Sequence, residues 1–170
     1  HNNDGVYRWE DGDYPLIKGD QAVWGVFNDL EVDPASLNVP LVLEVRWMAY
    51  AFQCNQLTGA DTVINYTTFM DMQFTNKSNR TYQQTHLALF VDGDIGIGIR
   101  DYSGMDVAGN GFYFYKSIDY DTAGHGYGFS PPAQGVYLLK GPLANPNDGI
   151  DNNRNGIIDE PNEDVAISSY

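Results

Sequence analysis

The residues best suited to chemistry are oxygen ligands that recur at every second position near the C-terminus. A calcium ion takes about six to eight oxygen ligands, and a tightly curled loop can present one from alternate residues. Gly156 stands at the sixth position of this pattern, where the chain must turn sharply, and the next carbonyl fills the seventh. The spacing therefore predicts a calcium site formed by Asp151, Asn153, Asn155, the Ile157 carbonyl and Asp159.

The last ligand of this predicted site departs from the usual calcium loop. The twelfth position holds Asn162 instead of a bidentate glutamate, so Glu160 or Glu163 is expected to supply that ligand. Few formal charges predict weak binding, with a dissociation constant on the order of 10⁻⁴ to 10⁻³ M. The alternative interpretation is an ordinary turn rich in asparagine and glycine.

The N-terminus carries half of the same pattern. Asn2 and Asp4 match the third and fifth positions, and Asp11 falls at the twelfth. The first position would precede His1, so the chain is expected to begin inside a calcium loop and to be a fragment of a longer protein.

A third acidic cluster follows a predicted strand in the middle of the chain. Carboxylates that converge at a strand end repel one another unless a cation neutralises them. Calcium is therefore the expected occupant, and a solvated acidic loop is the alternative. The cluster comprises Asp92, Asp94, Asp101 and Asp106.

Segments of alternating apolar and polar residues must position these loops. The clearest strand covers residues 41–52, and residues 63–76 and 82–92 alternate likewise, with a polar turn at 76–80 that predicts a hairpin. Shorter strands are expected at 21–27, 111–118 and 136–140, whereas no segment keeps a helical apolar stripe over three turns.

These segments predict an all-β fold, an antiparallel β-sandwich of jelly-roll or immunoglobulin-like type with calcium-binding loops. The sandwich is expected to span residues 1–145, the calcium-binding loop 146–164, and the start of a further segment 165–170. The aromatic residues are expected to form its core, namely Trp9, Trp24, Trp47, Phe69, Phe74 and Phe90.

The charge balance excludes two classes of partner. The 170 residues include 9 Lys and Arg against 23 Asp and Glu, a formal net charge of −14. A chain this acidic is repelled by nucleic acids and by anionic membrane surfaces. No run of about eighteen apolar residues occurs, so no membrane insertion is expected.

Several long motifs resemble a known family. The runs GDYPLIKGDQAVWGVFND, LEVRWMAYAF, FTNKSNRTYQQTHLALFVDGDIG, RDYSGMD, GYGFSPPAQGV and LLKGPLANPNDGIDNNRNGIIDEP occur in this order. They resemble a region of very large surface proteins of Bacteroidota that are exported by type IX secretion and carry a C-terminal sorting domain. The resemblance covers residues 4–161. It implies an extracellular or cell-surface location and an adhesive or structural role, without a settled biochemical activity.

The acidic stretch of that family is matched only in part. Asp94, Gly96, Asp101, Tyr102, Gly104 and Asp106 agree with the family pattern. Arg100 stands where the first of two paired acids is usual, and Met105 replaces a cysteine. The arginine removes one potential ligand from the third cluster.

The chain shows no positioned nucleophile, base and orienting group, so a non-catalytic, calcium-stabilised extracellular module is expected. Its expected partners are other domains of the same chain, or a surface glycan or protein. Two enzyme classes fit less well: a glycosidase using paired carboxylates, and a copper oxygenase using His1 with His86 or His125. The main alternative is a carbohydrate-binding module with a stacking surface of Tyr102, Tyr113, Tyr115, Tyr120 and Tyr127.

Overall fold

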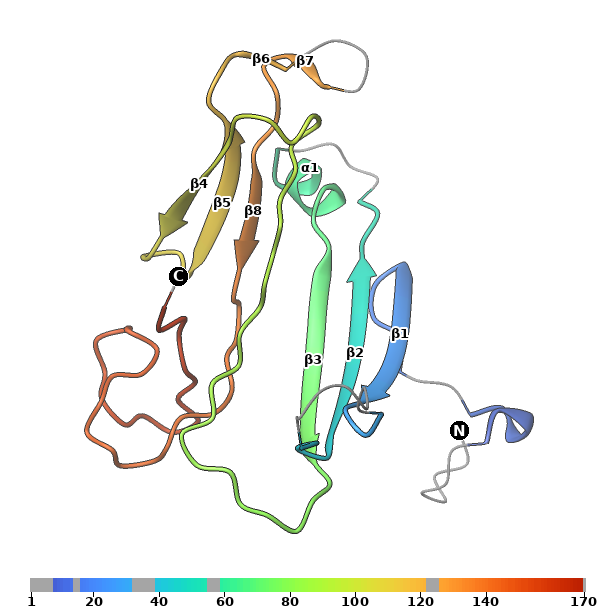
Figure 1. Cartoon of the computed structure of the whole chain (residues 1–170), viewed down its shortest axis with the longest axis vertical. Coiled ribbons are helices and arrows are strands. Elements are labelled where there is room, and N and C mark those ends of the chain that lie inside the picture. The colour runs from blue at the N-terminus through green and yellow to red at the C-terminus, as the bar shows by residue number, and fades with distance from the viewer. Residues whose placement is uncertain (1–7, 14–15, 32–38, 55–58, 122–125, 170) are drawn as a thin grey trace. The chain divides into compact units, whose positions relative to one another are not determined.

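The computed structural model describes residues 8–13, 16–31, 39–54, 59–121 and 126–169. The chain divides into two compact units, residues 1–85 and 86–170. The sequence had suggested a boundary near residue 145 and gave no sign of a division at 85. Each unit is built around its own antiparallel sheet (Figure 1).

The regular secondary structure of the described residues is mostly strand, in antiparallel sheets, which confirms the all-β prediction. Helix is confined there to α1 (Gly59–Asn65) and to one 3₁₀ turn, η1 (Trp9–Asp11). Within the described ranges, no helix combines the length and the apolar content needed to cross a bilayer.

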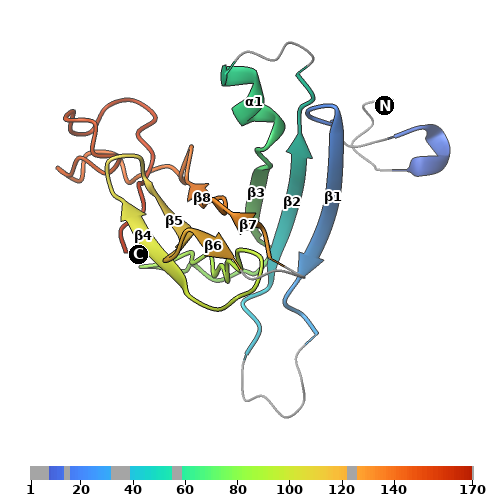
Figure 2. The same ribbon diagram turned by 90° about the horizontal axis from the view of Figure 1, so that it is seen from above.

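The first unit contains a three-stranded meander of β1 (Gln21–Asn28), β2 (Leu43–Ala51) and β3 (Phe69–Asn76), with β2 in the centre (Figures 1 and 2). The register places Trp47 of β2 between Gly25 of β1 and Met72 of β3. Alternate residues of a strand lie on the same face of a sheet. The face that carries Trp47 is therefore apolar, as the alternation in 41–52 predicts. Its apolar members are Val23, Phe27, Leu43, Val45, Trp47, Ala49, Met70, Met72 and Phe74.

One predicted strand is wrong in part, and another is wrong entirely. Residues 59–65 form α1, so the strand predicted for 63–76 begins only at Phe69. Residues 82–92 form no strand, and the predicted hairpin across 76–80 is absent although the polar turn itself exists. In that turn Asn76 accepts a hydrogen bond from the Ser78 N–H at 2.9 Å and donates to the Arg80 carbonyl at 2.7 Å. These side-chain bonds hold the turn without a paired strand.

The second unit contains a sheet of β4 (Asp101–Asp106), β5 (Gly111–Lys116) and β8 (Gln134–Tyr137), in the order β4-β5-β8. A separate two-stranded ribbon joins β6 (Tyr120–Asp121) to β7 (Gly128–Phe129). The Asn110 side chain, in the turn between β4 and β5, donates to the Leu138 carbonyl at 3.0 Å and accepts from the Ile167 N–H at 2.8 Å. Asn110 therefore ties both β8 and the C-terminal tail to the β4–β5 hairpin.

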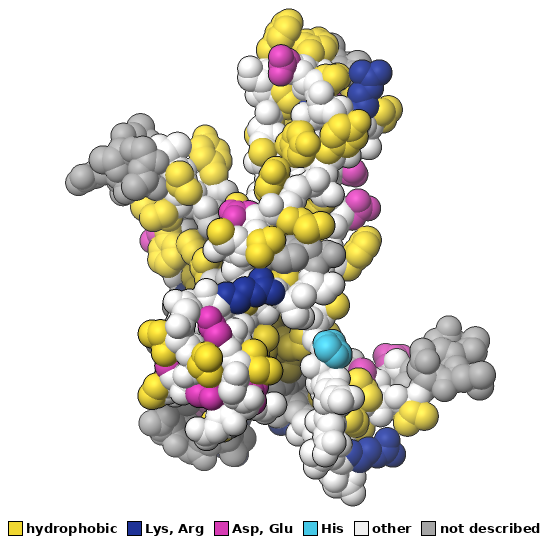
Figure 3. All heavy atoms as spheres, turned by 90° about the vertical axis from the view of Figure 1, so that its left-hand side faces the viewer, with side chains coloured by type: hydrophobic (Ala, Val, Ile, Leu, Met, Phe, Trp, Pro, Cys, Tyr) yellow, Lys and Arg dark blue, Asp and Glu magenta, His cyan; other side chains and the backbone are white. Residues whose placement is uncertain are grey.

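The aromatic core prediction is wrong for three of its members. Trp24, Phe74 and Phe90 are exposed, Phe90 by 89%. The buried apolar side chains among the described residues include no aromatic ring: they are Val45, Met48, Ile95 and Ala166. Apolar side chains therefore appear at many places on the surface (Figure 3). Of the others, Trp47 and Phe69 are half-buried, and the Trp9 side chain lies outside the described part.

Candidate functional site

The C-terminal loop predicted to bind calcium is closed by a short antiparallel bridge between Leu143 and Asp164. The Ala144 N–H donates to the Glu163 carbonyl at 2.9 Å, and the Val165 N–H donates to the Pro142 carbonyl at 2.9 Å. The segment between these bonds has no regular secondary structure of its own. Apart from two backbone hydrogen bonds, from the Glu163 N–H to the Glu160 carbonyl and from the Ala166 N–H to the Asn152 carbonyl, its shape depends on side-chain hydrogen bonds or on a bound ligand.

Asp151 organises the turn at the centre of the loop. Its Oδ1 accepts a hydrogen bond from the Asn155 N–H at 3.1 Å, and its Oδ2 accepts from the Gly156 N–H at 2.9 Å. Gly156 has a φ of 93°, in the left-handed region that glycine adopts without steric cost. The predicted first and sixth positions of the loop are thus brought together.

The two predicted asparagine ligands are held in the same turn. Asn153 Oδ1 accepts from the Asn155 N–H at 3.1 Å, and Asn155 Oδ1 accepts from the Ile157 N–H at 2.8 Å. Both amide groups donate to Glu160 Oε1, at 2.8 Å from Asn153 and 2.5 Å from Asn155. Each amide oxygen accepts one hydrogen bond here, which leaves a second lone pair for a cation.

Asp159, the predicted ninth-position ligand, contacts the start of the loop. Its carboxylate accepts from the Gly149 N–H, at 3.1 Å to Oδ2 and 3.3 Å to Oδ1. This contact joins the start of the loop to its far side. The Ile157 side chain is exposed, so the carbonyl is the only group by which this residue would contribute to a metal site.

Two buried carboxylate oxygens in the loop have no hydrogen-bond partner. Glu163 is only 6% exposed, and its Oε1 accepts from the Asn152 N–H at 2.5 Å while Oε2 is unpartnered. Glu160 Oε2 is likewise buried without a partner. Buried carboxylate oxygens are costly unless they are paired, so these atoms mark the place where a cation would be stabilised.

The loop residues fit calcium by their chemistry. Asp151, Glu160 and Glu163 offer carboxylate oxygens, and Asn153 and Asn155 offer neutral amide oxygens, the hard ligands that calcium prefers. Among the residues that the structure describes, no three His, Cys, Asp or Glu side chains form a metal-binding group by themselves. A site here would thus depend on amide and carbonyl oxygens as well as on the acids.

The N-terminal half-site cannot be placed in full. Asn2 and Asp4 lie outside the described residues. Asp11 is the last residue of η1, and its Oδ2 lies 3.4 Å from Arg8 Nη1. The buried Asp13 accepts from the Arg8 N–H at 3.0 Å, which closes the turn that contains η1.

The four acids of the third cluster do not gather around one point. Asp101 and Asp106 begin and end β4, five residues apart, so their side chains leave opposite faces of the sheet. Asp106 Oδ1 accepts from the Gly109 N–H at 2.9 Å in the β4–β5 turn. Asp94 lies beside Gly98, and Asp92 is exposed. A single ion cannot be bound by Asp101 and Asp106 together.

A lysine supplies the positive charge beside Asp101 that the sequence had assigned to calcium. The Lys116 side chain is 1% exposed, and its Nζ lies 2.8 Å from Asp101 Oδ1 and 3.5 Å from Asp121 Oδ1. The ammonium also donates to the Ile99 carbonyl at 2.8 Å and to the Ile97 carbonyl. In the run GFYFYK, Lys116 falls on the same face of the strand as Phe112 and Phe114. This pattern could have indicated an inward-facing charge.

Burial and charge pairing shift the pKa values of Lys116 and Asp121 in opposite directions. Burial lowers the pKa of Lys116, but the hydrogen bond and charge of Asp101, with the charge of Asp121, raise it above its ordinary value. Burial raises the pKa of Asp121, but hydrogen bonds from the Tyr127 and Ile97 N–H groups, with Lys116, bring it below its ordinary value. Lys116 and Asp121 are therefore both charged near neutral pH.

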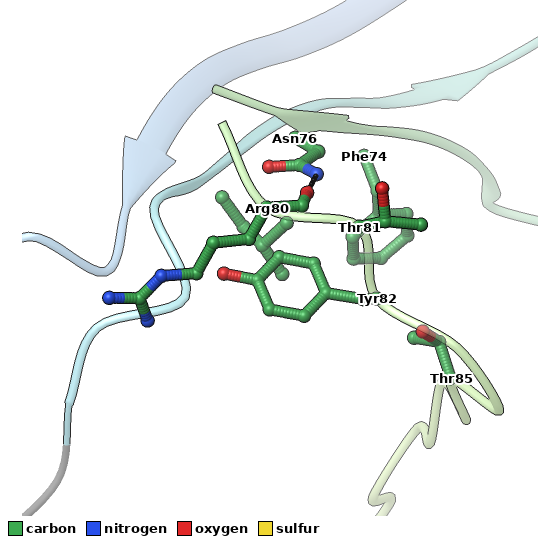
Figure 4. A pocket seen from close by; sticks show the side chains of 7 residues that line it. Phe74, Asn76, Arg80, Thr81, Tyr82 and Thr85 are labelled. Carbon is green, nitrogen blue, oxygen red and sulfur yellow. Dashed lines mark hydrogen bonds between the residues drawn. The ribbon is translucent and has the colours of Figure 1, made fainter. Parts of the chain in front are cut away.

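One shallow pocket lies in the first unit, beside the end of β3 (Figure 4). Its polar and aromatic wall includes Tyr82, whose hydroxyl donates to the Leu41 carbonyl at 2.7 Å. None of the predicted ligands lines it. The lining residues are Leu43, Phe74, Asn76, Arg80, Thr81, Tyr82 and Thr85.

Comparison with protein-family models, with curated proteins and with solved structures finds no match to this chain.

Proposed function

We propose that this chain is a non-catalytic, calcium-stabilised β-sandwich module of an extracellular or cell-surface protein. The observation that carries the proposal is that the loop contains two buried carboxylate oxygens without a hydrogen-bond partner, one in Glu160 and one in Glu163. A divalent cation is the simplest partner for such oxygens in a loop that also offers amide and carbonyl ligands. The expected role of the ion is structural.

The expected ligand set follows from the contacts in the loop. Asp151 and the two asparagine amides contribute from the turn, Glu160 and Glu163 replace the missing twelfth ligand, and the Ile157 carbonyl completes the set. Calcium would neutralise the carboxylates and give their buried oxygens a partner. Asp159 is expected to act mainly by closing the loop through Gly149.

The extracellular location is supported by the resemblance to surface proteins of Bacteroidota and by the expected weak calcium affinity. Sites with dissociation constants on the order of 10⁻⁴ to 10⁻³ M are filled in extracellular fluid and empty in the cytosol. A module of this kind would act as a structural or adhesive part of a longer chain, with neighbouring domains, surface glycans or surface proteins as partners.

Calcium titration by calorimetry should show weak binding that depends on the loop carboxylates. Glu163→Gln keeps the oxygen that accepts from Asn152 but removes the charge, so it should raise the calcium dissociation constant by about ten-fold. Asp151→Ala should raise it at least as much. Asp119→Ala makes the same change of charge at an exposed position outside the loop and should leave binding unchanged. Equal calcium binding by all four proteins would place the ion elsewhere.

The chain should hydrolyse neither glycans nor peptides, because no nucleophile, base and orienting group lie together in the described residues. Incubation with libraries of both substrate classes, followed by mass spectrometry, checks this. Metal-independent turnover that disappears on changing a single carboxylate to its amide would contradict a purely structural role.

A further inference from the structure

The β4-β5-β8 sheet has one face of unusual composition, which we call the tyrosine face. The register aligns Tyr102 with Tyr115, Gly104 with Tyr113, Asp106 with Gly111, and Gly111 in turn with Tyr137 of β8. Every strand residue on this face is a tyrosine, a glycine or an aspartate. They are Tyr102, Gly104, Asp106, Gly111, Tyr113, Tyr115, Gly135 and Tyr137.

Two of the tyrosine rings lie against glycine backbone. A Cβ atom added to Gly104 would collide with the Tyr113 ring, and one added to Gly111 or Gly135 would collide with the Tyr137 ring. Rings that cover glycine positions lie close to the strands instead of standing up from them. The glycines therefore make room for the rings of Tyr113 and Tyr137 beside the strands. The ring plane of Tyr115 is tilted by 39° to that of Tyr113 and by 82° to that of Tyr102.

The rings also contact one another and remain accessible. The Tyr115 ring centroid lies 5.9 Å from that of Tyr113 and 6.1 Å from that of Tyr102. The four side chains are exposed by 56% (Tyr102), 37% (Tyr113), 38% (Tyr115) and 46% (Tyr137). An exposed group of contacting aromatic residues usually marks a binding surface.

Polar atoms are distributed over the same face. The Tyr137 hydroxyl hydrogen-bonds to the Asp106 carboxylate, and burial together with that carboxylate raises the pKa of Tyr137 above its ordinary value. The tyrosine face thus offers aromatic rings for apolar contact and hydroxyl groups for hydrogen bonding. It carries no lysine or arginine among its strand residues.

We propose that the tyrosine face binds a neutral glycan chain. Sugar rings present flat C–H surfaces that stack on aromatic rings, and hydroxyl groups that hydrogen-bond with tyrosine and carboxylate side chains. The net charge of −14, with an aspartate on the face itself, opposes anionic polymers such as nucleic acids and acidic glycans. The face lacks the methionine and arginine side chains that, together with aromatic residues, are enriched in protein interfaces.

The stacking surface differs from the one that the sequence indicated. Tyr102, Tyr113 and Tyr115 share the face as expected, and Tyr137 joins them unexpectedly. Tyr120 belongs instead to the β6–β7 ribbon, where its ring makes an edge contact with that of Phe129 at a centroid distance of 4.7 Å. Tyr127 is an exposed residue outside the β4-β5-β8 sheet and provides a matched control.

Titration of the whole chain with neutral β-1,4-linked hexasaccharides of glucose, mannose and N-acetylglucosamine, followed by NMR, tests the proposal. At least one should bind and shift signals of the tyrosine face. Tyr113→Ala and Tyr137→Ala should each weaken binding by about ten-fold, whereas Tyr127→Ala should not change it. Tyr113→Phe keeps the ring and should retain most of the affinity, which separates stacking from loss of folding.

Three outcomes would overturn the proposal. One is a lack of binding to all three glycans at millimolar concentration by a folded chain. Another is binding that Tyr127→Ala weakens and Tyr113→Ala does not. The third is a concentration-dependent dimer that Tyr113→Ala disrupts, without glycan binding, which would make a second copy of the chain the occupant. The proposal does not depend on the calcium loop, so either can fail without the other.

Discussion

Replacing Lys116 with methionine is expected to lower the melting temperature of the second unit by about 10 °C. The ammonium is enclosed by Asp101, Asp121 and two backbone carbonyls, and its side chain is 1% exposed. Methionine fills a similar volume but leaves two buried carboxylates without a counter-charge. Losing one partner of a buried ionic cluster costs far more than losing an exposed ion pair. Thermal unfolding followed by circular dichroism measures the change.

Lys18 provides the matched control for this substitution. Its Nζ contacts the Asp71 carboxylate in the first unit, and the two side chains are 48% and 49% exposed. Because solvent screens that pair, Lys18→Met should change the melting temperature by no more than about 2 °C. If both variants melted alike, the Lys116 cluster would contribute no more than a surface pair.

The pH dependence of the Lys116 effect follows from the two pKa shifts. The lowered pKa of Asp121 stabilises the fold fully above its ordinary value of 3.8, and this contribution is lost as the pH falls through the folded pKa. The raised pKa of Lys116 stabilises the fold below its ordinary value of 10.5, and that contribution is lost as the pH rises through the folded pKa. The difference between wild type and Lys116→Met should thus be greatest between these two values.

A calcium chelator is expected to loosen residues 148–164 before any other part of the second unit. These residues form no core of their own, and the buried carboxylate oxygens of Glu160 and Glu163 lack a partner without a cation. Hydrogen exchange should accelerate at the Asn155 and Gly156 N–H groups, which Asp151 binds. The strands β4 and β5 should keep their protection, since they pair along their whole length.

Magnesium is the control for this experiment. It demands a tighter octahedral geometry than calcium and holds its water ligands strongly, so it should restore little of the lost protection. Equal exchange in the loop with chelator, magnesium and calcium would mean that hydrogen bonds alone hold the turn. The Asp151→Ala variant should exchange rapidly in all three conditions.

The sequence predicted the elements whose partners are local or strictly periodic. Alternation located β1, β2 and β5, because a period of two is imposed by the strand itself. The turn at 151–156 was predicted for a similar reason, since aspartate and asparagine bond to backbone groups only a few residues away. Interactions between residues that are close in the sequence can be predicted from a short segment, and these elements depend mainly on such interactions.

The features that the sequence did not reveal depend on distant partners. Residues 82–92 alternate like a strand but have no partner strand among the described residues. Residues 63–65, the start of another predicted strand, belong instead to the end of α1. The pairing of Asp101 with Lys116 requires the register of β4 on β5, which spacing alone does not specify. The alignment of glycines beneath tyrosines likewise appears only when three strands are placed together.

Differential scanning calorimetry with calcium and with a chelator tests the central claim most directly. Calcium at about a hundred times its dissociation constant should stabilise the unit that contains the loop by about 2.7 kcal/mol. For a chain of this size we expect the melting temperature to rise by about 5 to 10 °C, and Asp151→Ala to remove most of that rise. Superimposable melting curves with and without calcium would contradict a structural role for the ion and leave the loop as a polar turn.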